Sequence, residues 1–474
     1  MRARLGPDRR HRASRAVTAA EPWRLGVAAL AAAFRAGDLD PEAVVDALLD
    51  RIARRDPALN SLVAIDAEGA RAAARDSASR WRAGAPRSAI DGVPLTVKDN
   101  LLMAGLPATW GSRAYAEFRP AEDEAPVARL RAAGAVLLGK TNVPELTLEG
   151  YTSNLLFGTT RNPWNPSLTP GGSSGGAAAG VAAGFVPAAI GTDGGGSIRR
   201  PASHTGLVGF KPSLGRIPRS GGFPETLHDF EVIGTLTRSV ADAALLDAVL
   251  SGEVGPAPAV RGLRILSVPR FDDAPLDPEV AAACDAAAAT LAAAGHDVET
   301  GPVFFDRAAV DEIWRVVGRA GVARVARLTG GRLLAEGGPT IRAMAQEGAE
   351  LSGADYADAM SALAAFRRAV ARVFDRHDLV FMPSAAALPW RAEDAYPAAI
   401  DGQAVGPRGH AIYTGWVNAA GLPAVALPLG LSRAGLPIGG QFIAAAGRDA
   451  DLLAFAADVA PRLAAPSWPA LAET

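Results

Sequence analysis

Short apolar segments alternate with long helical patterns along most of this chain, and no other feature limits its fold as strongly. The segments typical of buried strands are GVPLTVKD, GAVLLGKTN, FVPAAIGTD, LRILSVP, DLVFMPS and LPAVALPLG. Residues 278–299 and 355–378 have the longest helical patterns between them. Strands that alternate with helices predict an α/β fold, in which helices cover both faces of a mixed, mostly parallel sheet.

The bulk composition is that of an ordinary globular protein. The chain has 474 residues, and we expect them to form one large unit rather than independent domains. Its formal net charge of −2 provides no general attraction for nucleic acid or an anionic membrane. No stretch approaches the roughly 18 apolar residues of a membrane span. Cys284 is the only cysteine, so no disulfide forms within the chain, and we expect a buried thiol in a cytoplasmic protein.

The two ends of the chain are predicted to lie outside the domain. Residues 1–22 are arginine-rich and are predicted to be a disordered tail, with an export signal as the alternative. The domain is expected to cover residues 23–465, beginning with surface helices, and residues 466–474 are assigned to a C-terminal tail. The segment GEVGPAPAVRG, residues 252–262, interrupts the pattern and is interpreted as a hinge between two halves.

Residues 171–197 carry the strongest chemical signal. The cluster GGSSGG opens a helix of small residues, a strand follows, and the cluster GGGS ends at Ser197. Glycines allow several backbone N–H groups to converge beside a serine hydroxyl, as an oxyanion hole requires. Each such donor typically contributes ~3 kcal/mol to an acyl-transfer transition state. The candidate donors are the amides of Gly194, Gly195, Gly196 and Ser197.

Two other interpretations of the glycine clusters remain open at this point. Phosphate binding is disfavoured, because neither cluster is followed by the lysine and hydroxyl residue of a P-loop, or matches a dinucleotide fingerprint. A nucleophile elbow around Ser173 or Ser174 is disfavoured by the proline-rich approach RNPWNPSLTP, which cannot be a central strand. An elbow would also need a histidine, and none has a recognisable setting: His204, His228, His296, His377 and His410.

Lys98 is a candidate base, because it ends the apolar segment GVPLTVK. Burial disfavours the charged form of a lysine and can lower its pKa by several units. Taken alone, the segment favours a lysine that pairs with Asp99 or reaches solvent over a lysine that acts as a base.

The combination of these motifs resembles the amidase signature family. The likeness rests on GGSSGG, on SIRRPASHTGLVGFKPSLGRIP from Ser197 onward, on GVPLTVKDN and on NAAGLPAVALPLGLSRAGLPIGGQFI, and it extends over about residues 23–460. The family implies an α/β/α fold around a mixed sheet, without metal or cofactor. It also implies a triad of Lys98, Ser173 after a cis peptide bond, and the nucleophile Ser197.

The resemblance assigns roles to further residues. Asp193 and Arg199 flank the nucleophile and are expected to brace its loop, and Ser174 to hold Lys98 or the loop. Gly194, Arg200 and His204 depart from what many members have. Segments that shape the acyl pocket in relatives contain mostly apolar residues here, which are expected either to line the pocket or to pack the core: Met103, Tyr151, Leu155, Phe157, Ile412, Tyr413 and Trp416.

The expected function is hydrolysis of a small-molecule amide by a free-standing enzyme, with an aryl or medium alkyl amide preferred over a small charged one. The free-standing enzyme is expected to associate, if at all, as a homodimer. The alternative is the glutaminase subunit of a tRNA-dependent amidotransferase, which works only with a partner. The stretch SGGFPETLHDFEVIGTLTRS resembles the free-standing enzymes more closely. A non-catalytic relative is disfavoured, because all three triad positions are intact.

Overall fold

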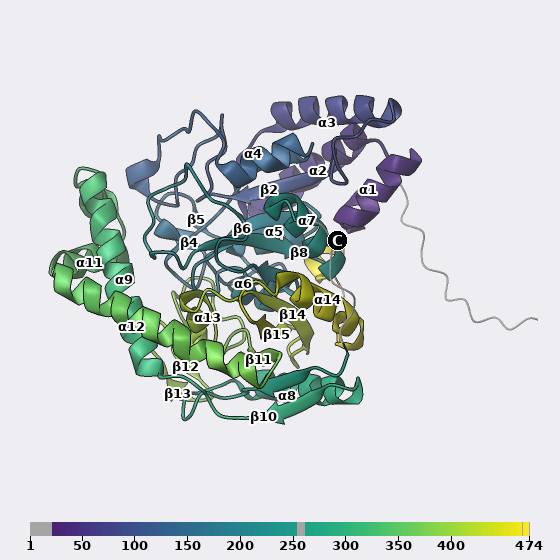
Figure 1. Cartoon of the computed structure of the whole chain (residues 1–474). Coiled ribbons are helices and arrows are strands. Elements are labelled where there is room, and N and C mark those ends of the chain that lie inside the picture. The colour runs from purple at the N-terminus through teal and green to yellow at the C-terminus, as the bar shows by residue number, and fades with distance from the viewer. Residues whose placement is uncertain (1–20, 254–260, 467, 474) are drawn as a thin grey trace, which may run out of the picture.

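The computed structural model of the chain describes residues 21–253, 261–466 and 468–473, and Figure 1 shows its arrangement. Most of the N-terminal tail and of the hinge predicted over 252–262 lies outside these residues. Eleven strands form the central sheet: β1 (Leu62–Ile65), β2 (Pro94–Lys98), β3 (Val136–Thr141), β6 (Ala188–Asp193), β7 (Val208–Lys211), β8 (Val232–Thr237), β9 (Arg264–Ser267), β10 (Asp297–Thr300), β11 (Leu379–Pro383), β14 (Ala424–Leu431) and β15 (Pro437–Ala444).

The strand order is β1-β3-β2-β6-β8-β7-β14-β15-β11-β9-β10. Strand β2 pairs in parallel with β3 and β6, and β9 pairs in parallel with β10 and β11. The other pairings in this sheet are antiparallel. The mixed sheet is therefore confirmed, but the prediction that it is mostly parallel is wrong. The apolar segments used for that prediction show burial, and burial does not report strand direction.

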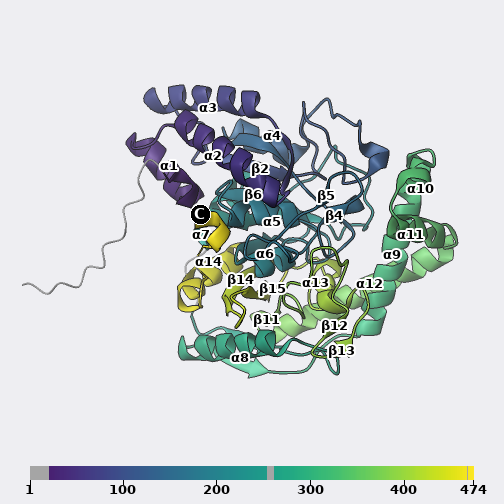
Figure 2. The same cartoon turned by 180° about the vertical axis from the view of Figure 1, so that it is seen from behind.

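Helices lie over both faces of the sheet, as the opposite views in Figures 1 and 2 show. The helices are α1 (Val27–Ala36), α2 (Pro41–Arg55), α3 (Ala67–Arg82), α4 (Ala125–Ala132), α5 (Gly175–Ala182), α6 (Arg199–Thr205), α7 (Val240–Ser251), α8 (Pro278–Ala293), α9 (Arg307–Leu328), α10 (Arg332–Glu336), α11 (Pro339–Ala349), α12 (Gly353–Ala371), α13 (Gly415–Ala419), α14 (Asp449–Val459) and α15 (Ala470–Glu473). Two small hairpins pair β4 (Ser153–Asn154) with β5 (Gly158–Thr159) and β12 (Ala399–Ile400) with β13 (Gln403–Ala404).

Local sequence signals set where several helices begin. The Asp277 side chain accepts hydrogen bonds from the first turn of α8, and Pro278 stands at a position that needs no N–H donor. Helix α12 begins with a capping box between Ser352 and Asp355. Cys284 lies buried within α8, where burial raises the pKa of its thiol.

The hydrophobic core divides along the sheet. One cluster surrounds β2, β3 and β6, with Val97, Leu138 and Ile190 fully buried. A second surrounds β9, β11, β14 and β15, with Phe381 and Phe442 stacked 4.7 Å apart. The central strands are buried along their whole length because helices cover both of their faces, and most of their side chains are apolar.

Helices α9 to α12 form an arm at one side of the sheet, coloured green in Figure 1. Helix α9 packs against α11 and α12. A third hydrophobic cluster joins the arm to the loops that carry Trp110 and Phe223. Its arm residues are Val322, Val325, Ala326, Leu333, Ile341 and Ala345. The arm therefore packs against these loops of the domain and does not stand apart from it.

The C-terminal segment packs against the first helices. Trp468 lies edge-on to Trp23 with 4.9 Å between the ring centroids, and Arg51 donates to the Ala472 carbonyl. The described part of the tail assigned to 466–474 thus contacts the domain. Periodicity in the sequence could not predict these contacts, because the residues that make them are far apart along the chain. No helix among the described residues is both long and apolar enough to span a bilayer.

Candidate active site

Lys98 ends β2 and is completely buried. Its Nζ lies 2.8 Å from Ser173 Oγ, 2.9 Å from Thr192 Oγ1 and 3.0 Å from the Thr192 carbonyl oxygen. The neighbouring Asp99 instead bonds Lys140, with 3.1 Å between Oδ1 and Nζ. The alternative in which Lys98 pairs with Asp99 or reaches solvent is therefore wrong.

The surroundings of Lys98 favour its neutral form. Burial lowers the pKa of its amine to about 7, against the opposing charges of Glu231 and Asp193. A neutral amine has two N–H donors and one lone pair. Thr192 offers two acceptor oxygens, which leaves the lone pair for the Ser173 hydroxyl. The three contacts can be made by a neutral amine, which accepts from Ser173, and equally by an ammonium group, which donates to all three oxygens.

Ser173 follows a cis peptide bond from Gly172 and stands just before α5. The next residue, Ser174, joins this segment to the second glycine cluster: its N–H donates to the Ser197 carbonyl at 3.1 Å, and its hydroxyl to the Thr192 carbonyl at 3.1 Å. Lys98 and Ser173 are no more than 1% exposed, whereas Ser197 is 6% exposed. Ser197 is therefore the most exposed of the three, although it is also buried.

The loop that carries Ser197 is held by the Asp193 carboxylate. It accepts from the amides of Gly196 at 2.7 Å and Ile198 at 3.1 Å. Gly196 has φ +111°, and an added Cβ would lie 2.2 Å from Thr414 Oγ1, so only glycine fits there. Because Asp193 already occupies its N–H, Gly196 is not a free oxyanion donor, contrary to the sequence prediction.

Three of the four predicted donors remain available. Among the described residues, the amides of Gly194, Gly195 and Ser197 have no protein acceptor. The space that a side chain at position 194 would take is filled by Leu227, whose Cδ1 lies 2.7 Å from a Cβ added there. The glycine at this position therefore leaves no gap in the loop.

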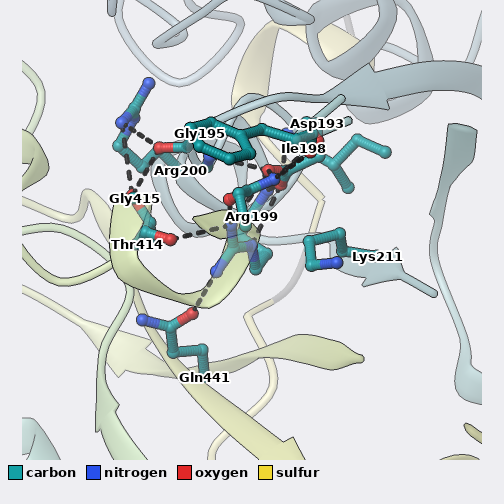
Figure 3. A network of polar contacts seen from close by, with 12 residues as sticks. Asp193, Gly195, Ile198, Arg199, Arg200, Lys211, Thr414, Gly415 and Gln441 are labelled. Atoms are coloured by element: carbon teal, nitrogen blue, oxygen red, sulfur yellow. Dashed lines mark hydrogen bonds and ion pairs between the residues drawn. The ribbon is translucent and has the colours of Figure 1, made fainter. Parts of the chain in front are cut away.

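A buried ion pair fixes Asp193 in turn (Figure 3). Arg199 Nη2 lies 2.9 Å from Asp193 Oδ1, and the same guanidinium donates to Gln441 and to the Thr414 carbonyl. Burial alone would raise the pKa of Asp193, but the Arg199 charge holds it well below its usual range. The predicted bracing pair is present, and residues over 200 positions away complete it.

The geometry does not support a nucleophile elbow. No strand leads into Gly171 or Gly172, because residues 163–169 form turns and take part only in two isolated bridges. None of the five described histidines bonds Ser173 or Ser174. His204 and His377 bond a carbonyl and a carboxylate, His228 approaches Tyr356, His296 accepts from an amide, and both ring nitrogens of His410 lack a partner. Burial lowers the pKa of His204 to about 4.

Comparison with known proteins agrees with this geometry. The family described as Amidase matches residues 43–453, which is most of the chain. The chain belongs to the amidase signature family. A curated relative in Synechococcus sp. (strain CC9605), which is a glutamyl-tRNA(Gln) amidotransferase subunit, is 34% identical over 86% of this chain and 90% of the relative. The fold class predicted from the sequence is confirmed.

Solved structures of the amidase signature family superpose over nearly the whole chain. One, described as an amidase, has a TM-score of 0.87 and 31% identity, and covers 93% of this chain and 100% of its own. Another, a bacterial aryl acylamidase, has a TM-score of 0.84 and 30% identity, and covers 92% and 96%. This family member is accordingly an amidohydrolase.

The predicted pocket residues are dispersed. Met103, Tyr413 and Trp416 are buried within the hydrophobic clusters, the alternative that the sequence left open for them. Leu155 is half exposed, at 50%. Tyr151, Phe157 and Ile412 are partly buried.

Sequence reasoning missed side chains that hold or enclose the site. Thr192 directly precedes Asp193 in β6, and successive side chains of a strand point to opposite faces of the sheet. This alternation is a sequence signal from which Thr192 could have been identified. Thr414, Asn418 and Gln441 carry no local signal, because tertiary packing brings them to the pair of Asp193 and Arg199 from far along the chain. Trp314 of α9 lies beside the nucleophile loop, with its Cη2 3.0 Å from a Cβ added to Gly195.

The described residues contain no group of His, Cys, Asp and Glu side chains arranged to hold a metal ion. Lys211 is a second buried lysine near the site. Its Nζ donates to the Pro212 carbonyl, and burial lowers its pKa to about 7. Lys211 contacts neither serine, so the site is built from one buried lysine, two serines and a loop with free amides.

Proposed function

We propose that the chain hydrolyses a carboxylic amide through a seryl acyl-enzyme, with Ser197 as the nucleophile, Ser173 as the proton relay and Lys98 as the base. The observation that carries this proposal is the 2.8 Å contact of Lys98 with Ser173, beneath a loop whose amides remain free. A lysine with lowered pKa can accept a proton at neutral pH, which an ordinary lysine cannot.

The reaction divides into two acyl transfers. Ser197 Oγ attacks the carbonyl carbon while its proton passes to Ser173, and the Ser173 proton passes to Lys98. The amides of Gly194, Gly195 and Ser197 stabilise the oxyanion as it forms. Protonated Lys98 returns its proton through Ser173 to the departing nitrogen, which leaves as ammonia or an amine. Water then hydrolyses the acyl-enzyme by the same relay.

The preferred substrate is an aryl or medium alkyl amide. Support comes from apolar groups beside the glycine loop, since Trp314 packs beside Gly195 and Leu227 beside Gly194. Leu227 also lines a cavity of about 160 Å³ that has both apolar and charged side chains, among them Phe223 and Arg219, and that does not include Ser197. The similar bacterial aryl acylamidase is consistent with this preference.

A second candidate function is supported by the curated relatives. Those in Synechococcus and Roseiflexus are 34% and 35% identical to this chain, and both are glutamyl-tRNA(Gln) amidotransferase subunits. In that case the chain would release ammonia from glutamine within a complex, using the same nucleophile. The two candidates differ in whether the chain acts alone.

Two measurements test the proposal. Purified chain is assayed with an arylacetamide and with glutamine, and we expect the arylacetamide to be hydrolysed faster without any partner. Glutaminase activity that requires the presence of other proteins of an amidotransferase complex would favour the second candidate. In parallel, a fluorophosphonate probe is applied to wild type and to Ser197→Ala.

The labelling experiment has a matched control. Ser203 is a buried serine on α6 whose hydroxyl donates to the Gly439 carbonyl at 3.4 Å. We expect Ser203→Ala to be labelled like wild type and Ser197→Ala not to be labelled. Persistent labelling of Ser197→Ala would overturn the assignment of the nucleophile.

A further inference from the structure

Arg200 bonds both glycine clusters at once. Its Nη1 donates to the Gly195 carbonyl at 2.7 Å, and its Nη2 to the Gly172 carbonyl at 3.3 Å (Figure 3 shows the first contact). Gly195 precedes Ser197 by two residues, and Gly172 directly precedes Ser173. One planar guanidinium therefore connects the segment of the relay serine to the segment of the nucleophile.

No carboxylate balances the charge of Arg200. Among the described residues, its side chain donates to the two carbonyls and, at 3.2 Å, to Thr414 Oγ1. Its Nε has no partner there. Asp193 is the acidic group that acts on it, but Asp193 is already paired with Arg199. Burial and the neighbouring Arg408 and Arg199 lower the pKa of Arg200 to about 9, which still leaves it charged at neutral pH.

The histidines around Arg200 do not offset this charge. His204 and His410 are buried, each has a ring nitrogen without a partner, and Arg200 contributes to the lowered pKa of both. Both are consequently neutral near pH 7. A buried charge without a counter-charge is unfavourable for stability, and its presence beside the two serines points to a role in the site.

We propose that Arg200 is a positioning residue for the acyl transfer: it fixes the relay serine relative to the nucleophile loop, and its charge helps to keep Lys98 neutral. This inference rests on the proposed function. A guanidinium is suited to the first task because its donors have a rigid, planar arrangement. The Gly195 carbonyl accepts from Arg200 and, at 2.8 Å, from Thr414 Oγ1, so the loop between the free amides is held from two sides.

The second task follows from the charges that act on Lys98. Glu231 and Asp193 favour its protonated form, while Arg219 and Arg200 oppose it. Arg219 is largely compensated, because it pairs with Glu124 and Glu231. Removal of the Arg200 charge should therefore raise the pKa of Lys98. In the pH profile of kcat/KM, the acid limb, where activity falls as Lys98 becomes protonated, should then move to higher pH.

The test compares Arg200→Gln and Arg200→Lys with wild type. For Arg200→Gln we expect kcat to fall about 10- to 100-fold with little change in KM, because a misplaced catalytic group loses that much. Its acid limb should move up by roughly 0.5 pH unit. Arg200→Lys retains the charge but not the planar fork, so its kcat should fall while the limb stays in place. This second variant tests the inference even if Arg200→Gln does not fold.

Arg238 provides a matched control. It is another arginine whose hydrogen bonds go only to backbone carbonyls, those of Leu25, Val181 and Val186. Val181 lies near the end of α5 that is remote from Ser173. Burial lowers the pKa of Arg238 to about 10. We expect Arg238→Gln to reduce thermal stability while kcat and the acid limb match wild type.

Four results would contradict the inference, a part of it, or the proposed function on which it rests. An Arg200→Gln enzyme with wild-type kcat and limb overturns it, and so does an equal effect of Arg238→Gln. A limb that moves equally in Arg200→Lys and Arg200→Gln removes the electrostatic part. A wild-type chain that neither hydrolyses amides nor reacts with a fluorophosphonate contradicts the proposed function itself, which distinguishes the two failures.

Discussion

The floor and the wall of this site are built in different ways. The floor is polar: Lys98, Ser173 and Thr192 are buried, and Lys98 is bonded to the other two. The wall is apolar and includes Trp314, which belongs to the arm formed by α9 to α12. Polar groups in a buried network have few alternative arrangements, whereas apolar contacts tolerate many shapes. We infer from this difference that the floor sets the reaction and the arm sets the substrate.

Loss of the base should have the largest effect on the floor. We expect Lys98→Met to lower kcat/KM by about 10³- to 10⁴-fold, since a residual rate would come from the oxyanion donors alone. Lys211→Met is the control, because Lys211 is also buried with its pKa lowered to about 7. Steady-state kinetics of both variants decide the matter: similar losses would place the base elsewhere.

Removal of the Thr192 hydroxyl should have a smaller effect on the same network. Thr192→Val deletes one of the two acceptors of Lys98 and the partner of Asn100. We expect kcat to fall about 10- to 100-fold, because the orientation of Lys98 is no longer fixed. Thr96→Val on β2 removes a buried hydroxyl that has no partner and should leave kcat near wild type. Equal kinetics for both variants would contradict the role of Thr192.

The pH dependence of kcat/KM tests the charge of the floor directly. Lys98 must be neutral to accept a proton, so activity should fall as pH drops below its pKa of about 7. One unit lower, at pH 6, the rate should be about tenfold lower. The same shift from 10.5 makes unfolding free energy decrease as pH falls from about 10.5 to 7 and level off below. A flat profile between pH 6 and 9 would argue against Lys98.

A change in the wall should affect binding and leave the chemistry intact. We expect Trp314→Ala to raise KM for an arylacetamide about tenfold, with little change in kcat and little effect on acetamide. Trp314→Phe keeps an aromatic ring but loses the Nε1 bond to the Gly415 carbonyl and should lie between the two. If kcat for both substrates fell together, the wall would also support the loop of Ser197.

The sequence was informative about the floor and poor about the wall. Glycine and serine spacing located both loops, and the apolar run before Lys98 located its strand, because these signals lie within a few residues of the groups concerned. The direction of many strands was missed, since burial alone does not encode it. Trp314, Asn418 and Gln441 were missed because they reach the site only through tertiary packing. The sequence could not separate pocket residues from core residues for the same reason: Met103 and Trp416 are apolar in either role.

The bracing of the nucleophile loop has a consequence for protein synthesis. Lys98, Ser173 and Ser197 leave the ribosome long before Gln441 and Asn418, the partners of Arg199 in the second half of the chain. A nascent chain therefore holds all three reacting groups while Asp193 and Arg199 still lack those contacts. The loop can therefore gain its full set of contacts only when translation is nearly finished.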